Sequence, residues 1–499
     1  MSFFFTNQEL VSFIRSLGYK NVNDGMLKWL RGQLNTTEGS LNDLWFRYLR
    51  QLGYQGSLND MFRNYSEDTK HSIPSLYIDF ANGTGNNLIT FTRTTTATRM
   101  NSLGELEEVP VGTMRAFSYA EHHPSTLESL GYKAEPSATN RIKDNTGTAA
   151  VVGAPGTLPT DWSWTNTGTL STEVVSKGTQ NGINYVDVRL FGTTSTTSTD
   201  LNLAVSNNIA ATIGQVWAGS AYLAIVGGAF TNITGVALRA GEYSITPTYL
   251  DEVWTPTVYN SLPTSVSPAD RKREIGTTNQ ATIAYILPYL QFTFASGVAI
   301  DITLRIGLPQ LENNIVTSAI YTTGTVSTRN GDSAVINSLT PWYNQNEGTF
   351  VIDAISHYLV GTSDSTSRIF FAVGDPTKAL GSAEMMYLVR QLSTSTLTFA
   401  MLDGGAAQLT GISASIGAST RFRAAFSYKL NDCAGSFIGA AALTDTAATI
   451  PTPTKLSIGN GEAAWSGIST SNGVCGTIKS LSYYNTRKSN ADLVILSSL

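Results

Sequence analysis

The sequence predicts a mainly β protein in which a short helical repeat module precedes two β-sandwiches of jelly-roll type. The chain has 499 residues, which suggests about three domains. Charged residues make up only 14% of it, and 44 glycines accompany tracts rich in Thr, Ser and Asn, a balance typical of loop-rich β proteins. A short Asn-Asp unit also recurs near the start. We expect a helical module at 1–70, an extended β-rich connecting block at 71–144, and sandwiches at 145–325 and 326–499.

The helical module is predicted from that repeat, in which Asn-Asp is followed each time by apolar and aromatic residues at helical spacing. The unit occurs at residues 23–24, 42–43 and 59–60. We interpret each polar pair as a helix N-cap, and a capping-box spacing from Thr6 to Glu9 predicts one earlier helix. Four helices this short are marginal alone, so they must pack on one another or on a partner. In the second case Trp29, Trp45 and Phe62 are the docking residues.

The rest of the chain alternates apolar and polar residues, the period of β-strands. Strands are predicted at 76–80, 88–93, 185–191, 215–226, 282–294, 299–306, 348–355, 368–373, 385–390, 396–402, 421–428, 435–441, 456–459 and 477–484. Gly, Ser, Thr and Asn clusters separate them, which favours sandwiches. A last helix is predicted after Ser489 as its N-cap.

Charge and composition exclude several classes of function. The net charge is −5 and no Lys/Arg-rich run occurs, so nucleic-acid binding is not expected. No stretch of about 18 apolar residues and no signal-like start is present, so we expect a soluble protein, without membrane insertion, that is not secreted by a signal of its own. Cys433 and Cys475 cannot form a disulfide framework, and we expect two buried thiols rather than a bridge.

No pattern in the sequence predicts catalysis, a metal site or a cofactor. The four histidines have no metal-ligand spacing, and the Gly/Ser stretches lack the spacing of a nucleophile elbow. Asp251 and Glu252 beside Trp254 form the most suggestive acidic and aromatic cluster. Adjacent residues of a strand point to opposite faces, however, so this pair cannot act on one substrate. We expect an ordinary strand there.

Sugar binding without catalysis would use exposed aromatic rings on sandwich edges and loops. Trp465 lies between two turn-like clusters and is the first candidate, followed by Trp254 and Tyr259. The alternative is that each tryptophan belongs to a hydrophobic core.

Several stretches match a known group of proteins. They include Phe91-Thr92-Arg93 with Ala97-Thr98-Arg99, residues 101–107, Glu135 to Arg141, and residues 309–312, 318–323, 327–332 and 476–484. Together they resemble structural proteins of tailed-bacteriophage virions, the head-fibre or head-spike and tail-fibre group, with residues 145–300 matched by layout only. The resemblance implies a carbohydrate-binding-like sandwich at 145–325 and a lectin-like sandwich, of concanavalin or laminin-G type, at 326–499.

The resemblance implies a non-enzymatic structural protein, made in the bacterial host cytoplasm and located in the virion. Its N-terminus would anchor it to capsid, neck or tail proteins, and its sandwiches would stabilise the particle or attach it to host surface glycans. A homo-oligomer, specifically a homotrimer, is implied as well. The alternatives are a glycan-degrading tailspike enzyme and a purely structural tail or neck adaptor without a ligand.

Overall fold

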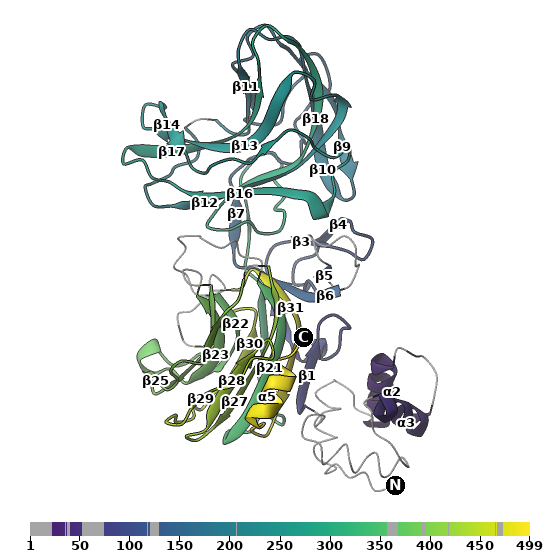
Figure 1. Cartoon of the computed structure of the whole chain (residues 1–499), viewed down its shortest axis with the longest axis vertical. Helices are drawn as coiled ribbons and strands as arrows, with labels where there is room; N and C mark the ends of the chain where they lie inside the picture. Colours follow the sequence, from purple (N-terminus) through teal and green to yellow (C-terminus); the bar gives the residue numbers. More distant parts are fainter. Residues whose placement is uncertain are drawn as a thin grey trace.

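The protein is mainly β and forms two sandwiches, as the computed structural model shows (Figure 1). The structure describes residues 22–34, 36, 40–51, 74–116, 118–119, 129–205, 207–356, 368–391, 395–417, 419–464, 466 and 473–499. The first sandwich lies above the second in Figure 1, and the short strands β3, β4 and β7 lie between them. Of the described helices, none combines the length and the apolar character that a membrane span requires.

Two short helices of the predicted module fall within the described residues: α2 (Val22–Gln33) and α3 (Leu41–Gln51). They contact each other and bury Met26, Leu30 and Leu44. The Asn-Asp pairs are not the caps, because both lie inside the first turn of a helix. At α3 the Ser40 side chain accepts the hydrogen bond from the Asp43 N–H, which is the cap function that the sequence analysis gave to Asn-Asp. The first and fourth predicted helices lie outside the described residues.

The first sandwich consists of two antiparallel sheets, which in the described residues have the orders β16-β12-β18-β10-β9 and β14-β13-β17-β11-β8, with β15 beside β13. Their bounds are β8 Ser163–Thr165, β9 Ser171–Gln180, β10 Ile183–Thr193, β11 Ser198–Asn202, β12 Val216–Gly228, β13 Ile233–Ser244, β14 Tyr249–Glu252, β15 Val258–Tyr259, β16 Arg271–Thr277, β17 Ile283–Phe294 and β18 Ala299–Asn313, with a 3-10 helix at Pro268–Asp270. Alternate side chains of both sheets meet in one core, which includes Val188, Leu238 and Leu290.

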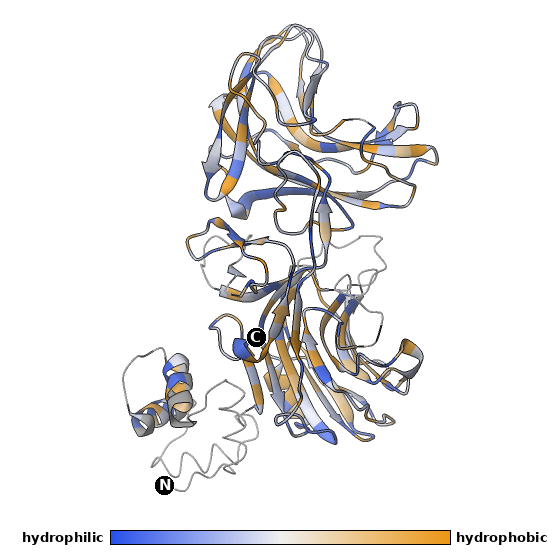
Figure 2. Cartoon of the chain, turned by 180° about the vertical axis from the view of Figure 1, so that it is seen from behind, coloured by the Kyte–Doolittle hydropathy of each residue, from blue (hydrophilic) through white to orange (hydrophobic). Residues whose placement is uncertain are grey.

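The second sandwich also has two antiparallel sheets, with the orders β29-β28-β27-β21-β31-β6-β5 and β2-β20-β30-β22-β23-β24-β25; β1 pairs with β31 and β26 with β24. The bounds are β1 Leu76–Asp79, β2 Thr90–Thr92, β5 Ser118–Tyr119, β6 Ser129–Ala134, β20 Ser333–Ile336, β21 Glu347–Ser356, β22 Arg368–Gly374, β23 Met385–Gln391, β24 Thr396–Asp403, β25 Ala406–Ala407, β26 Ser413–Ser415, β27 Arg421–Lys429, β28 Cys433–Phe437, β29 Leu443–Asp445, β30 Lys455–Ile458 and β31 Gly476–Tyr484, with 3-10 helices at Asn86–Leu88 and Leu380–Ser382. Hydrophobic and hydrophilic positions alternate along many of the strands in both sandwiches (Figure 2).

The segment predicted as a connecting block supplies strands to both sheets of the second sandwich, because β1 and β6 pair with β31 while β2 pairs with β20. Two small ribbons remain between the sandwiches: β3 (Ala97–Met100) with β4 (Leu106–Val109), and β7 (Ala138–Asn140) with β19 (Ser327–Arg329). The predicted final helix is α5 (Asn490–Leu496), which packs on β27 and β28. Ser489 is its N-cap, as predicted, and the structure adds a capping box between Ser489 and Asp492.

Candidate functional site

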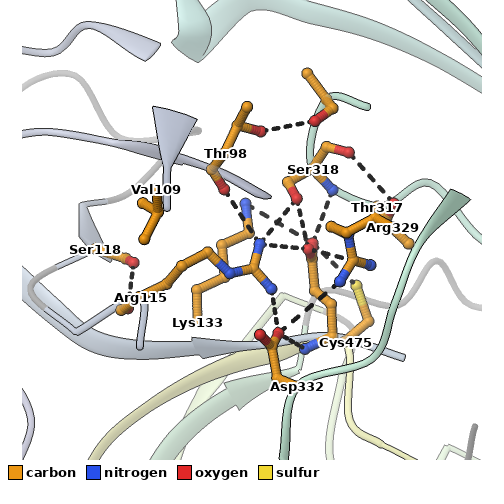
Figure 3. Close-up of polar contacts among 12 residues, drawn as sticks. Thr98, Val109, Arg115, Ser118, Lys133, Thr317, Ser318, Arg329, Asp332 and Cys475 are labelled. Atoms are coloured by element: carbon orange, nitrogen blue, oxygen red, sulfur yellow. Dashed lines mark hydrogen bonds and ion pairs between the residues drawn. The ribbon is translucent and has the colours of Figure 1, made fainter. Parts of the chain in front are cut away.

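Five charged residues meet in a buried cluster between the two sandwiches, and all but Arg115 come from the stretches that carry the resemblance (Figure 3). We call it the junction cluster: Arg93 after β2, Arg115 before β5, Glu135 after β6, Arg329 at the end of β19 and Asp332 before β20. Each of these side chains is at most 1% exposed. Only 14% of the residues in the chain are charged, and five of these charged residues are buried together in this cluster.

The junction cluster is held by short, charge-assisted hydrogen bonds. Arg115 Nη1 donates to Glu135 Oε2 at 2.6 Å, and Arg115 Nη2 donates to Asp332. Arg93 Nη1 donates to the other oxygen of Asp332 at 2.9 Å. The Ser318 hydroxyl donates to Glu135 Oε2 at 2.6 Å and brings the end of the first sandwich into the cluster. The two sandwiches and the segment between them are therefore joined by one ionic network.

The electrostatics of the cluster favour the charged forms of Glu135 and Arg115. Burial alone would raise the pKa of the Glu135 carboxyl, but Arg115, Arg329 and Lys133 outweigh burial and hold this pKa well below its ordinary value. Burial acts against Arg115 as well, yet Asp332 and Glu135 raise its pKa above the ordinary one. With every charged group enclosed, the cluster stabilises the junction and offers no surface to a ligand.

The aromatic residues predicted to stack on sugars lie in different environments. Trp254 is 5% exposed, belongs to the core of the first sandwich, and donates its Nε1–H to the Leu238 carbonyl at 3.0 Å. The exposed face that sugar stacking requires is absent there, so the core alternative applies to Trp254. Tyr259 is half-buried, and the Lys272 ammonium lies 5.1 Å from its ring centre. Trp465 lies outside the described residues.

Of the residues predicted to dock on a partner, the structure describes the side chain of Trp45 alone. It is 1% exposed, so its side chain is buried in this structure. The neighbouring Phe46 is 38% exposed. Phe62 and the side chain of Trp29 lie outside the described part of the chain.

Asp251 and Glu252 contact different partners, as the alternation argument predicted. Asp251 accepts a hydrogen bond from Gln280 Nε2 at 3.1 Å. Glu252 instead accepts from Arg239 Nη1 at 3.3 Å, from the Tyr249 hydroxyl at 3.3 Å and from the Tyr289 hydroxyl. Glu252 therefore belongs to a set of polar side chains from several strands that the sequence analysis did not identify.

That set covers the outer face of the six-stranded sheet and is called here the tyrosine face. Its members are Asp200 of β11, Arg239 and Tyr243 of β13, Tyr249 and Glu252 of β14, and Tyr289 and Gln291 of β17. The residues between them, such as Leu238 and Leu290, point into the core, so alternation directs these seven outward. In register, Arg239 lies opposite Tyr289, and Tyr243 opposite Tyr249.

Aromatic rings and hydrogen-bonding groups are interleaved on the tyrosine face. The rings of Tyr243 and Tyr249 meet edge to face with centres 5.8 Å apart, and Tyr249 is 49% exposed. Gln291 Nε2 donates to Asp200 Oδ1 at 3.0 Å. Partial burial raises the pKa of Asp200 and of Glu252, and burial together with Glu252 raises the pKa of Tyr249 to about 12. Rings that stack and oriented donors and acceptors are the groups that recognise sugar hydroxyls.

No family model matches the chain, and no curated protein matches it. The solved structures with distant similarity include the following three. A mutant sialidase of Trypanosoma rangeli that displays trans-sialidase activity is 12% identical, with a TM-score of 0.25; the match covers 33% of this chain and 26% of that one. The CBM22-1–CBM22-2 tandem domain of Paenibacillus barcinonensis Xyn10C is 10% identical, with a TM-score of 0.21 and coverage of 68% and 99%. Domains LG4-5 of mouse laminin α1 are 8% identical, with a TM-score of 0.18 and coverage of 63% and 88%.

Proposed function

We propose that this protein is a non-enzymatic structural component of a tailed-phage virion, a head or tail fibre or spike, that attaches the particle to host surface glycans. In this proposal residues 1–70 anchor it to a capsid, neck or tail protein. The tyrosine face of the first sandwich is the glycan-binding surface. The observation that carries the glycan-binding part is the exposed Tyr249 ring beside Glu252, Arg239 and Tyr243 on one sheet face.

The junction cluster supports a spike-like role. The stretches that resemble phage virion proteins supply four of its five charged residues, and together with Arg115 these residues join the two sandwiches through buried ion pairs. A fixed junction would hold the tyrosine face at a set position relative to the rest of the chain. Copies on one particle would then bind a glycan surface together, so that sites of millimolar affinity give strong adhesion. The proposed oligomer is a homotrimer, as in the resemblance.

The spacing of carboxylates on the tyrosine face favours binding over hydrolysis. Asp200 and Glu252 are three strands apart in the sheet and four residues apart along it. With about 4.8 Å between strands and about 3.3 Å per residue, their Cα atoms are roughly 19 Å apart. Glycoside hydrolysis uses two carboxyl groups roughly 5–10 Å apart. The glycan-degrading tailspike is therefore the second candidate, and the adaptor without a ligand is the third.

The anchor is tested on particles. Virions made with the full chain and with a variant lacking residues 1–70 are compared by mass-resolved composition and by cryo-electron microscopy, after circular dichroism has shown that the purified variant retains its β structure. We expect intact particles from which the truncated protein is missing. Its retention on particles would contradict the anchor.

The ligand is tested with the purified full chain on host surface polysaccharide. We expect reversible binding without release of oligosaccharides. Release of oligosaccharides would establish the enzyme alternative, and absence of any binding would favour the adaptor.

A further inference from the structure

A pocket of about 280 Å³ lies beside the junction cluster, but a larger one of about 370 Å³ lies at one end of the first sandwich and has the more informative lining. Arg141 and Lys143, which follow β7, contribute to the larger pocket together with Asp161, Asn208 and Trp217. Trp217 is the second residue of β12, whereas Asp161 and Asn208 come from loops. We call it the end pocket. Its volume is that of a site for a small ligand.

Two residues that line the end pocket each carry a buried side-chain donor without an acceptor in the described part of the chain. The donors are the Arg141 Nε–H and the Trp217 Nε1–H, and Trp217 is only 1% exposed. Buried donors in folded proteins nearly always have a partner. Trp254, in the core of the same sandwich, follows this rule through the Leu238 carbonyl. The end pocket thus carries two donors that a bound molecule could satisfy.

The charges around the end pocket leave one positive group in excess. Lys143 Nζ lies 2.7 Å from Asp161 Oδ2, which also accepts a hydrogen bond from Asn208 Nδ2 at 3.1 Å. Within the described residues no carboxylate forms an ion pair with Arg141. A planar guanidinium with free donors matches the two oxygens of a carboxylate. The Asp161 carboxylate and the Asn208 amide, fixed in place by each other, match hydroxyl groups.

We propose that the end pocket binds a sugar acid, that is, a monosaccharide unit carrying a carboxylate. The carboxylate is bound by Arg141, the hydroxyls face Asp161 and Asn208, and the Trp217 N–H donates to a ring or hydroxyl oxygen. A compact inorganic anion would use the guanidinium and leave the amide and the indole N–H without a role. This inference deepens the proposed glycan attachment, on which it rests, and adds a site separate from the tyrosine face.

The test uses the full-length chain and measures binding of D-glucuronate, D-glucose and inorganic phosphate by saturation-transfer NMR and calorimetry. We expect glucuronate to bind in the millimolar range and glucose to bind at least tenfold more weakly. Arg141→Gln should weaken glucuronate binding at least tenfold, and Trp217→Phe should weaken it severalfold because it removes the N–H and keeps an aromatic ring. Lys177→Gln is the matched control, since it removes one exposed positive charge from β9 of the same sandwich.

The outcomes separate this inference from the proposed function. Equal binding of glucose, equal binding of phosphate, or glucuronate binding that Arg141→Gln leaves unchanged would each overturn the end pocket as a sugar-acid site. Should Arg141→Gln fail to fold, Lys143→Gln and Trp217→Phe address the same pocket. A Tyr249→Ala variant that loses polysaccharide binding but retains glucuronate binding would support two distinct sites. Polysaccharide binding without glucuronate binding would refute the end pocket and leave the proposed function standing.

Discussion

The Arg115 guanidinium donates a hydrogen bond to the Asp332 carboxylate across 217 positions of sequence, and neither side chain is exposed to solvent. Arg115 precedes β5 and Asp332 precedes β20, so the pair links the segments that come before and after the first sandwich in the sequence. Arg93 and Arg115 bind different oxygens of the same carboxylate. Asp332 therefore accepts hydrogen bonds from two buried guanidinium groups and compensates their charge.

Replacing Asp332 should destabilise the protein strongly. Asp332→Asn leaves Arg93, Arg115 and Arg329 buried with Glu135 as their remaining carboxylate partner in the cluster, and breaking a buried pair in this way typically costs about 3–5 kcal/mol. The free energy of unfolding from urea titration measures the loss. Asp432→Asn is the control, because it removes the exposed partner of Arg487 and should change stability by about 0–1 kcal/mol. Equal losses for the two variants would contradict the role of burial.

The free energy of unfolding should fall at acidic pH. Asp353 allows a test of whether loss of its ion pairs with Arg421 and Arg423 is a cause. Burial would raise the pKa of Asp353, but hydrogen bonds from Arg421 and Arg423 outweigh burial and lower it. Because the folded-state pKa lies below the unfolded value, the contribution of Asp353 to stability is fully present above about pH 4 and is lost as the pH falls through the folded-state pKa. Glu312 acts in the opposite direction, since burial raises its pKa and its contribution is lost as the pH rises.

The measurement is the free energy of unfolding of the wild type and of Asp353→Asn between about pH 2.5 and 7. The wild type should be the more stable near neutral pH, and the difference should shrink below about pH 4. Lys177→Gln, which changes an exposed side chain and leaves every carboxylate in place, should keep a constant difference from the wild type. A difference between Asp353→Asn and wild type that stays constant down to the lowest pH would refute the ion-pair explanation.

Both cysteines should be unreactive in the folded protein. The structure confirms the expectation of two buried thiols without a bridge. Burial raises the pKa of Cys433 to about 11, and burial together with Glu135 raises the pKa of Cys475 further. The thiolate is the reactive form, so iodoacetamide at about pH 8 should modify neither residue until guanidinium unfolds the chain. Intact-mass measurement checks this, and labelling of Cys475 in the folded state would contradict the enclosed junction.

The strands were predictable from the sequence because alternation is a local property. The stretch 421–428 is observed as β27, Arg421–Lys429, and the expected final helix is α5. The partners of the strands were not predictable in the same way. Leu76 of β1 lies opposite Tyr483 of β31, and the local sequence pattern around neither residue identifies the other as its partner. For this reason a block expected to connect the helical module to the first sandwich instead supplies strands to the second sandwich.

The candidate site was less predictable than the fold. The opposite orientations of Asp251 and Glu252 followed from strand geometry and are observed. The burial of Trp254 could not be predicted from strand geometry. The acidic residues beside it in the sequence do not show which side of the segment packs against the core. The tyrosine face draws on four strands, of which β11, β13 and β17 are far apart in sequence. The sequence did contain a pattern of Tyr, Arg and Gln at outward-facing positions of β13 and β17. That pattern identifies a shared surface only when the pairing register of the two strands is known.

Tyr249 should contribute to glycan binding without contributing much to the fold. Its ring is 49% exposed, packs edge to face on Tyr243, and its hydroxyl donates to Glu252. Tyr249→Ala removes a stacking surface whose loss typically weakens binding by about 1 kcal/mol, or roughly fivefold in Kd. The measurement is the Kd of the purified full chain for host surface polysaccharide, together with the melting temperature, which should change little.

Tyr259→Ala is the matched control for Tyr249→Ala. Tyr259 belongs to β15, which pairs with β13 of the same sheet, and the Lys272 ammonium lies over its ring. A sugar would have to displace that cation to stack there, so this variant should retain the wild-type Kd. If Tyr259→Ala weakened binding and Tyr249→Ala did not, the glycan site would lie at the edge of the sheet, where the sequence had suggested it, and the tyrosine face would have another role. Equal weakening by both would indicate a ligand long enough to run along β13 from β14 to β15.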